Sequence, residues 1–281
     1  MMKPRVGPPF SATMAVLAIA VAVTAVAVAG QGWDRRGRRA PAFRPSEAAQ
    51  PGFMFCRLAY SSVRREALGT GWNTDYPDSD RNFMIRFSEL TKAEISRWEN
   101  GEAFHAVVTL ADDELFSCPF IFASDVGTAG FSVAEEDRLR EYLLKGGFLW
   151  VDDFWGRRAW ANWEAQIGRV LPRAQYEIVD VQLSHPMLQS LYNVPDFPQV
   201  PSIQFWRQSG RSGTSERGGD SAEPHLRAIF DEDGRAMVVM SHNTDIADGW
   251  EREGEDDEFF YNFSPAAYGV GINIVLYVLS H

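Results

Sequence analysis

The stretch 119–151 constrains the fold of this chain more than any other part of the sequence. It contains an apolar run, PFIFAS, then a helix-like segment, then a second apolar run, FLWV. Ser132 and Glu135 have the spacing of a capping box at the start of a helix. Gly146 and Gly147 supply the left-handed residue at which such a helix ends. Because unbroken apolar strands are typical of parallel strands covered on both faces, the stretch predicts a βαβ unit with a right-handed crossover.

The rest of the chain alternates strand-like and helix-like segments in the same way. The run DEDG between two strand-like segments is a hairpin signal. The pattern predicts an α/β fold with a doubly wound, mostly parallel sheet and a C-terminal hairpin and helix. Strands are expected at 53–60, 105–110, 119–124, 148–151 and 176–183, the hairpin at 225–241, helices at 81–95, 132–145, 160–170 and 264–280, a mobile surface insertion at 208–224 and an acidic loop at 251–260.

The N-terminal region differs from the rest in composition. An uncharged run, 10–32, follows two basic residues, and its segment 27–29 has the small-x-small form of a signal-peptidase site. The run is also long enough to span a bilayer as an uncleaved anchor. We expect the domain to be exported, either periplasmic or anchored to the inner membrane. The expected organisation is a signal peptide or N-terminal membrane anchor at 1–29, a flexible linker at 30–52 and a folded domain at 53–281.

Charge and cysteine content limit the partners. The formal net charge of −11 argues against nucleic acid, since neutralising phosphates needs a basic face. Membrane contact is expected only through the N-terminal segment. The sequence has no zinc-type spacing of Cys and His, and we expect no metal and no cofactor. Cys56 and Cys118 each stand near a strand start and are expected to be buried free thiols, with a disulfide as the alternative in an oxidising compartment.

Asp152 and Asp153 follow the apolar run FLWV and are the first candidates for a site. In open α/β sheets ligands bind outside the carboxyl ends of the strands, where this pair is expected to lie. Successive side chains on a strand point to opposite faces, which argues against a converging acid/base pair. We expect one carboxylate to face the cleft and the other to accept N–H groups near Trp155 and Gly156. Structural roles for both, and true catalysis, are the alternatives.

His185 and Asp125 are the other candidates for this rim. His185 stands at a His-Pro corner after a strand, which would bring its imidazole beside the aspartates as a base or a metal ligand. The alternative is an imidazole that only bonds a backbone carbonyl. Asp125 follows PFIFAS and precedes a glycine-containing loop without phosphate-binding spacing. The predicted ligand-binding set is therefore Asp125, Asp152, Asp153 and His185, and the catalytic residues stay unknown.

Two looser polar sets and an acidic run complete the candidates. Aromatic residues mixed with Asn and Asp suit a sugar or polar small molecule, and equally a self-packed loop. The run 255–258 lacks the alternating ligands of a calcium loop and is expected to be solvated. The first set is Trp72, Asn73, Asp75 and Tyr76, and the second is His242, Asp245 and Trp250.

Several segments together resemble a known family. The block PFIFASDVGTAGFSVAEEDRLREYLLKGGFLWVDDFWG, together with FMFCRLAY, GWNTDYPDSDRNF, SHPML, DGRAMVV and YGVGINIVLYVL, resembles the domain of unknown function DUF4159. That bacterial family is commonly found with export signals. It looks like a distant branch of the class I glutamine amidotransferase-like superfamily, which includes the trehalose-utilisation-like proteins. The resemblance implies a flavodoxin-like three-layer sandwich for residues 53–281.

The resemblance also bears on chemistry. Amidotransferases of that superfamily carry a nucleophilic cysteine in a Gly-x-Cys-x-Gly elbow, and GGFLWVDDFWG resembles that slot with Asp152 and Asp153 in place of the cysteine. Glutamine hydrolysis therefore lacks its nucleophile here. The family is often seen near envelope operons with MoxR-type ATPases, which favours partner binding. We expect the rim to bind a polar small molecule or a cell-envelope protein; the alternative is a hydrolase-like or isomerase-like enzyme using Asp152, Asp153 and His185.

Overall fold

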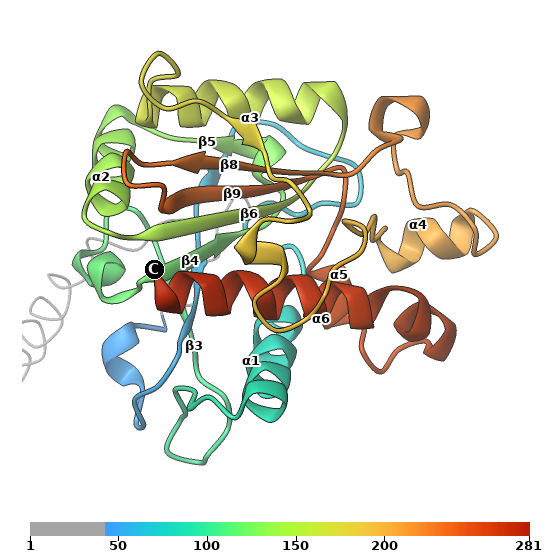
Figure 1. Ribbon diagram of the computed structural model, residues 1–281, viewed down its shortest axis with the longest axis horizontal. Helices are drawn as coiled ribbons and strands as arrows, with labels where there is room; N and C mark the ends of the chain where they lie inside the picture. The colour runs from blue at the N-terminus through green and yellow to red at the C-terminus, as the bar shows by residue number, and fades with distance from the viewer. Residues whose placement is uncertain (1–42) are drawn as a thin grey trace, which may run out of the picture.

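The computed structural model describes residues 43–281, and Figure 1 shows how their helices and strands are arranged. The predicted leader, 1–29, and most of the predicted linker, 30–52, lie outside the described residues. The strands are β1 (Phe55–Leu58), β2 (Ser61–Ser62), β3 (His105–Val108), β4 (Phe120–Ala123), β5 (Ala129–Gly130), β6 (Phe148–Phe154), β7 (Val179–Asp180), β8 (His225–Phe230) and β9 (Ala236–His242). The α-helices are α1 (Asp78–Thr91), α2 (Val133–Leu144), α3 (Gly156–Val170), α4 (Ile203–Gln208), α5 (Asp248–Glu251) and α6 (Asp257–Ser280). Short 3-10 helices are η1 (Pro45–Glu47), η2 (Asp113–Ser117), η3 (Val126–Thr128), η4 (Pro186–Leu188) and η5 (Gly218–Ser221).

The central sheet has seven strands in the order β3-β1-β4-β6-β9-β8-β7. The first five are parallel, and β8 and β7 are added antiparallel at one edge. Numbered along the chain, the parallel strands have the order 2-1-3-4-5, which is the flavodoxin-like arrangement. The predicted α/β fold and its C-terminal hairpin and helix are confirmed. The strand order reverses between β1 and β4, so ligand binding is expected at the carboxyl ends of these two strands.

Helices cover both faces of the sheet, which makes a three-layer sandwich. Figure 1 shows α2 and α3 on one side of the strands and α1 and α6 on the other. Alternate residues of each strand enter two separate cores: Phe122 and Trp150 pack with α1 and α6, whereas Ala123 and Val151 pack with α2 and α3. Burial on both faces explains why the parallel strands are apolar without alternation.

The predicted βαβ unit is present with its caps. Ser132 and Glu135 form the capping box, with the Ser132 N–H donating to Glu135 Oε2 at 2.8 Å and Ser132 Oγ accepting from the Glu135 N–H at 3.4 Å. Gly146 has a φ of +102°, which favours glycine. At Gly147 a Cβ would come within 2.4 Å of the Tyr142 ring, so only glycine lets the Tyr142 hydroxyl reach the Cys118 carbonyl at 2.7 Å.

Cys56 and Cys118 form a disulfide, so the expectation of free thiols is wrong. Cys56 lies on β1 and Cys118 lies two residues before β4, and these strands are neighbours although β3 separates them in the chain. Both cysteines are fully buried. The pairing depends on the strand order, which the spacing of the two cysteines in the sequence does not show.

The C-terminal helix α6 packs across the sheet. It begins at Asp257, earlier than predicted, because Asp256 caps it by accepting the N–H groups of Glu258 and Phe259. Part of the predicted acidic loop therefore forms the first turn of the helix. Among the described residues α6 is the one helix long and apolar enough to cross a membrane, judged by length and composition alone. Most of its apolar stretch is buried inside the protein, as in the core helix of a soluble domain.

Candidate functional site

A cavity of about 250 Å³ lies where β1, β4, β6 and β9 end, at the reversal of the strand order. We call it the acidic pocket, because eight carboxylate side chains line it. Residues after β1 and β9 form two of its walls, and the insertion predicted at 208–224 closes a third. The carboxylates belong to Glu66, Asp75, Asp125, Asp153, Glu216, Asp245, Asp248 and Glu251, and the other lining residues include Thr70, Asn73, Tyr76, Trp155, Ser202, Arg217 and Arg252.

Asp153 reaches the pocket because the end of β6 is irregular. The register with β9 shifts between Val151 and Phe154, and Asp153 has a φ of +54°, which is rare for a residue with a Cβ. Its Oδ1 accepts a hydrogen bond from Trp155 Nε1 at 2.9 Å. Side chains held in such backbone conformations cluster at functional sites, and here the distortion places a carboxylate in the pocket wall.

Asp152 points to the other side of β6, as strand alternation predicts. It is fully buried and does not line the acidic pocket. Its Oδ2 accepts the N–H of Ala247 at 2.9 Å, whereas its Oδ1 accepts no hydrogen bond within the described part of the chain. The predicted division of roles is therefore present, although the donor is Ala247 and not the backbone near Gly156, whose N–H is bonded by Asn243.

Asp125 ties the loop after β1 to the end of β4. It has a φ of +51°, and its Oδ2 accepts the Gly71 N–H at 2.8 Å. A Cβ on Gly69 would come within 2.4 Å of the same carboxylate oxygen, so glycine is needed for this approach. Asp125 thus lies in the wall of the pocket and also holds the loop that forms the opposite wall.

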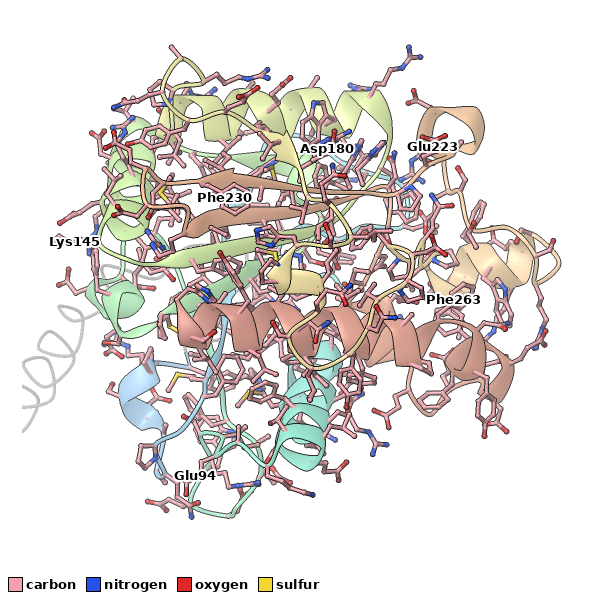
Figure 2. The ribbon with its side chains drawn as sticks, viewed as in Figure 1. Glu94, Lys145, Asp180, Glu223, Phe230 and Phe263 are labelled. Carbon is pink, nitrogen blue, oxygen red and sulfur yellow. A yellow bond between two sulfur atoms is a disulfide. The ribbon has the colours of Figure 1, made fainter. Side chains whose placement is uncertain are left out.

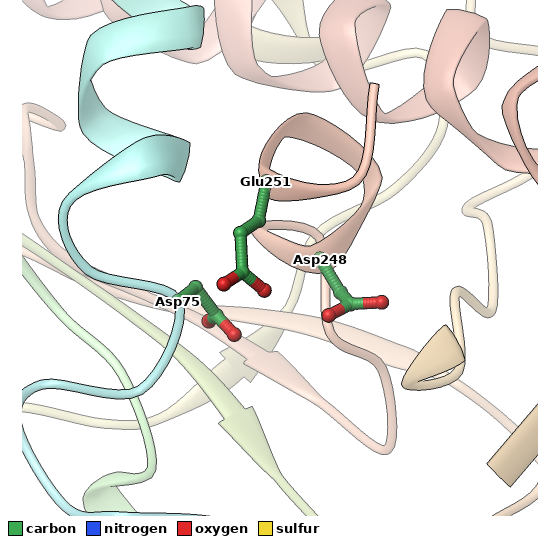
Figure 3. Close-up of side chains that lie close together, drawn as sticks. All are labelled: Asp75, Asp248 and Glu251. Atoms are coloured by element: carbon green, nitrogen blue, oxygen red, sulfur yellow. The ribbon is translucent and has the colours of Figure 1, made fainter. Parts of the chain in front are cut away.

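Asp75 lies at the centre of the carboxylates. It also has a left-handed backbone, with a φ of +64°, and its Oδ2 accepts a hydrogen bond from Ser124 Oγ at 2.9 Å. Figure 3 shows Asp75 facing Asp248 and Glu251 of α5. One carboxylate oxygen from each of these three residues lies within 4.8 Å of the others.

A second triad shares Asp75 and contains Asp153 and Asp245, again with all three ligand atoms within 4.8 Å of one another. The chain after β9 shapes this side: the Asp248 N–H donates to Asp245 Oδ1 at 2.8 Å, and Asp248 Oδ2 accepts the Ile203 N–H at 2.8 Å. Because all members of both triads are carboxylates, this part of the pocket offers only oxygen ligands.

Most of the buried aspartates in and beside the acidic pocket have no ion-pair partner within the described chain. Across residues 43–281 no ion pair joins Asp75, Asp125, Asp152, Asp153 or Asp245 to an arginine or lysine, whereas Arg252 pairs with Asp248 and Glu251 on α5. Burial, and then the charge of Glu251, raises the pKa of Asp75 to about 7. Burial likewise raises the pKa of Asp125 to about 7.

Burial also raises the pKa values of Asp153 and Asp245 well above the usual carboxyl range, and the neighbouring aspartates add to it. The same cause raises the pKa of Asp152, to which the charge of Asp75 contributes. The metal-free pocket must therefore hold protons at neutral pH, or a cation must take their place.

His185 lies at the end of the strands opposite the acidic pocket. Its ring packs on Phe230 and Tyr277, with centroids 5.5 and 5.6 Å away, and Phe230 pairs with the first residues of β9. Figure 2 shows Phe230 and Glu223 near opposite ends of the β8 hairpin strand, and the acidic pocket is at the Glu223 end. The prediction that His185 shares a rim with Asp152 and Asp153 is wrong, because β7 has only two residues and the chain then turns back along α6.

Sequence patterns indicated some of the pocket residues only as members of loose polar sets. Asp75 and Asp245 appeared in separate polar sets, and the strand order now brings them together. His242 and Trp250 do not line the pocket: His242 packs on Phe154, and Trp250 is buried in the core beneath α6. No sequence pattern indicated Asp248, Glu251, Glu216 or Arg217, because acidic and Gly/Ser-rich segments resemble solvated surface until their position in the fold is known.

The comparisons with known proteins agree with the resemblance seen in the sequence. The family model described as domain of unknown function (DUF4159) matches residues 54–279, which is most of the chain. The chain therefore belongs to the DUF4159 family. No curated protein matches it.

Proposed function

We propose that this chain binds a hard divalent cation in the acidic pocket, as a polar-ligand-binding domain. The observation that carries the proposal is the position of Asp75, whose carboxylate belongs to two triads of oxygen ligands, each within 4.8 Å. Such spacing lets three carboxylates contact one ion. The triads lie at the reversal of the strand order, where α/β sheets bind their ligands.

The electrostatics support a cation in preference to an anion or an apolar ligand. Several buried carboxylates without a cationic partner repel one another, and this repulsion is relieved by protons or by a bound cation. Asp152 adds to this repulsion from outside the pocket, because its charge contributes to the raised pKa of Asp245. A cation would compensate these groups together.

The ligand atoms indicate the class of ion. Carboxylate oxygens suit Ca²⁺, Mg²⁺ and Mn²⁺, whereas Zn²⁺ and Cu²⁺ favour imidazole and thiolate groups, which neither triad contains. Ca²⁺ also accepts varied geometry and six to eight ligands, which suits a wall of several side chains and loop carbonyls. We therefore propose Ca²⁺ or Mn²⁺ as the first ions to test. This revises the expectation that no metal binds.

Thiol-dependent glutamine hydrolysis is not part of the proposal. Asp152 and Asp153 lie near the end of β6, where the resemblance places a nucleophilic cysteine, and both cysteines of the chain are joined in the disulfide. The relation to the glutamine amidotransferase-like superfamily remains a proposal supported by the fold. An enzyme that combines Asp153 with His185 is disfavoured, because these residues lie at opposite ends of the strands of the sheet.

We also propose export of the domain. The support is the disulfide between Cys56 and Cys118, since disulfides persist mainly in oxidising compartments. The uncharged run 10–32 is consistent with this location. Alkaline phosphatase fusions in a bacterial host would test it: activity of a fusion at the C-terminus supports export, and activity only of a cytoplasmic reporter contradicts it.

Calorimetric titration of the metal-stripped chain with CaCl₂ and MnCl₂ tests cation binding. We expect Asp245→Asn to weaken the affinity by about tenfold or more, because it removes a charged ligand while its amide oxygen can still accept the Asp248 N–H. Asp196→Asn, at an exposed position outside the pocket, is the matched control and should leave the affinity within about twofold. Equal affinities for wild type and Asp245→Asn would overturn the proposal.

A further inference from the structure

A second cavity of about 650 Å³ adjoins the acidic pocket. The two share Glu66, Gly69, Thr70, Asn73 and Asp125 in their walls, so a molecule in the second cavity would lie beside an ion in the acidic pocket. The volume is within the usual range for small-molecule sites, which is about 300–1,000 Å³. The second cavity therefore has room for an organic ligand.

The walls of the second cavity have a different chemistry. Arg65, Asn73 and Ser61 line it, and none of their side chains has a hydrogen bond or ion pair within the part of the chain that the structure describes. They offer a guanidinium, an amide and a hydroxyl to a ligand. These unengaged donors distinguish the second cavity from the acidic pocket. Two carboxylates, Glu66 and Asp125, line both cavities, and Glu66 is paired with Arg64 and Arg217.

The rest of the cavity wall is held in place. Residues Ser61–Ser62 of β2 pair antiparallel with β5, and Ser62 Oγ lies 3.2 Å from Thr128 Oγ1. The Tyr60 hydroxyl donates to the carbonyl oxygens of Ser124 and Asp125, at 2.6 and 2.7 Å. A wall fixed in this way presents its free groups without further ordering, which favours ligand binding.

We propose that the second cavity binds a hydroxyl-rich organic anion, an acidic sugar, next to the cation. Arg65 pairs with the anionic group, because its guanidinium has five donors in a fork that matches carboxylate and phosphate oxygens. Asn73 and Ser61 bond the sugar hydroxyls. Asp125 links the two ligands, since it lines both cavities and holds the 69–71 loop through the Gly71 N–H. The link to the cation rests on the proposed function, whereas binding of the sugar alone does not.

The test is calorimetric titration of the full chain with three probes: glucuronate, glucose 6-phosphate and uncharged glucose. We expect at least one anionic sugar to bind about tenfold more tightly than glucose, and the two anionic probes separate a carboxylate from a phosphate ligand. Arg65→Gln should remove this preference. Arg158→Gln is the matched control, since Arg158 is an exposed arginine on α3 outside both cavities. Equal binding of glucose and both anions, or an unchanged Arg65→Gln variant, overturns the proposal.

Repeating the titrations with CaCl₂ separates the two proposals. We expect Ca²⁺ to strengthen anionic-sugar binding in wild type, and Asp245→Asn to lose the Ca²⁺ effect while it still binds the sugar in EDTA. Sugar binding with no Ca²⁺ binding would contradict the cation proposal alone. Ca²⁺ binding with no anionic-sugar binding would contradict the second-cavity proposal alone.

Discussion

Two groups of buried charge stand a few residues apart in this protein, and they differ in how the charge is compensated. Asp80 at the start of α1 pairs with Arg57 of β1, and both side chains are fully buried. The Arg57 guanidinium donates to both Asp80 oxygens, to Ser79 Oγ at 2.8 Å and to the Thr74 carbonyl at 3.3 Å. Each of the three guanidinium nitrogens therefore donates a hydrogen bond inside the protein.

Asp75 lines the acidic pocket just before α1 and has no such ion-pair partner among the described residues. The comparison separates a structural charge from one available to a ligand. The Arg57–Asp80 pair holds the loop that carries Asp75 against β1, whereas Asp75, Asp153 and Asp245 remain without an arginine or lysine in any ion pair of the described chain. Buried charge that the fold does not neutralise is the property expected of a cation site.

The largest expected effect is on the structural pair. Asp80→Asn leaves the Arg57 guanidinium buried without a counter-charge, and we expect it to lower the free energy of unfolding by about 3–5 kcal/mol. Urea denaturation followed by tryptophan fluorescence measures this change. The matched control is Asp137→Asn, which removes an exposed ion pair with Arg140 and should cost less than about 1 kcal/mol. If Asp80→Asn lowered the free energy of unfolding as little as Asp137→Asn, the buried Arg57–Asp80 pair would not have the structural role that separates it from the acidic pocket.

Removing a carboxylate from the acidic pocket should instead raise the free energy of unfolding. Without divalent cations at about pH 8, Asp245→Asn removes one uncompensated charge, and we expect it to raise the free energy of unfolding by about 1–2 kcal/mol. Urea denaturation in EDTA measures the change. With saturating Ca²⁺ the order should reverse, because only wild type then gains stability from the bound ion. A loss in EDTA similar to that of Asp80→Asn would show that Asp245 serves the fold.

The pocket also makes stability depend on pH. Asp75 and Asp125 have raised folded pKa values of about 7, so the folded state holds these protons more tightly than the unfolded state. Their contribution to stability is present below about pH 4 and is lost as the pH rises through about 7. We expect the midpoint of thermal unfolding in EDTA to fall over this range, and Asp75→Asn to flatten the fall. A midpoint in wild type that rises steadily to pH 8 would contradict the raised pKa values.

The smallest expected effect is at His185. The His185 ring packs on Phe230 and Tyr277, at the end of the strands opposite the acidic pocket. His185→Ala should therefore change the Ca²⁺ affinity by less than about twofold. Titration calorimetry with CaCl₂ measures the affinity. A loss comparable with that of Asp245→Asn would show that His185 reaches the pocket after all.

Local sequence signals predicted the elements of the fold well. The capping box at Ser132, the Gly146-Gly147 end of α2 and the hairpin at 225–241 depend on residues close together in the chain. The unbroken apolar runs of the strands likewise predicted that the strands are buried on both faces. The rim positions of Asp125 and Asp153 were expected because both residues come after the predicted strands 119–124 and 148–151.

The rest of the site depends on contacts between distant segments, which the sequence pattern does not show. Asp75 and Asp245 converge only because β1, β4, β6 and β9 lie side by side in that order. The same order brings Cys56 to Cys118. The left-handed backbone at Asp153 comes from a register shift against β9, and no local motif marks it.

The most direct test of the account is the number of protons released when Ca²⁺ binds. Titration calorimetry of the metal-stripped chain at about pH 7, in two buffers of different ionisation enthalpy, gives this number. The account predicts release of about one proton or more, because the ion displaces protons from carboxyl groups whose pKa values are raised to about 7 or above. Ca²⁺ binding without proton release, or no Ca²⁺ binding, would contradict the claim that the buried carboxylates of the acidic pocket hold the cation.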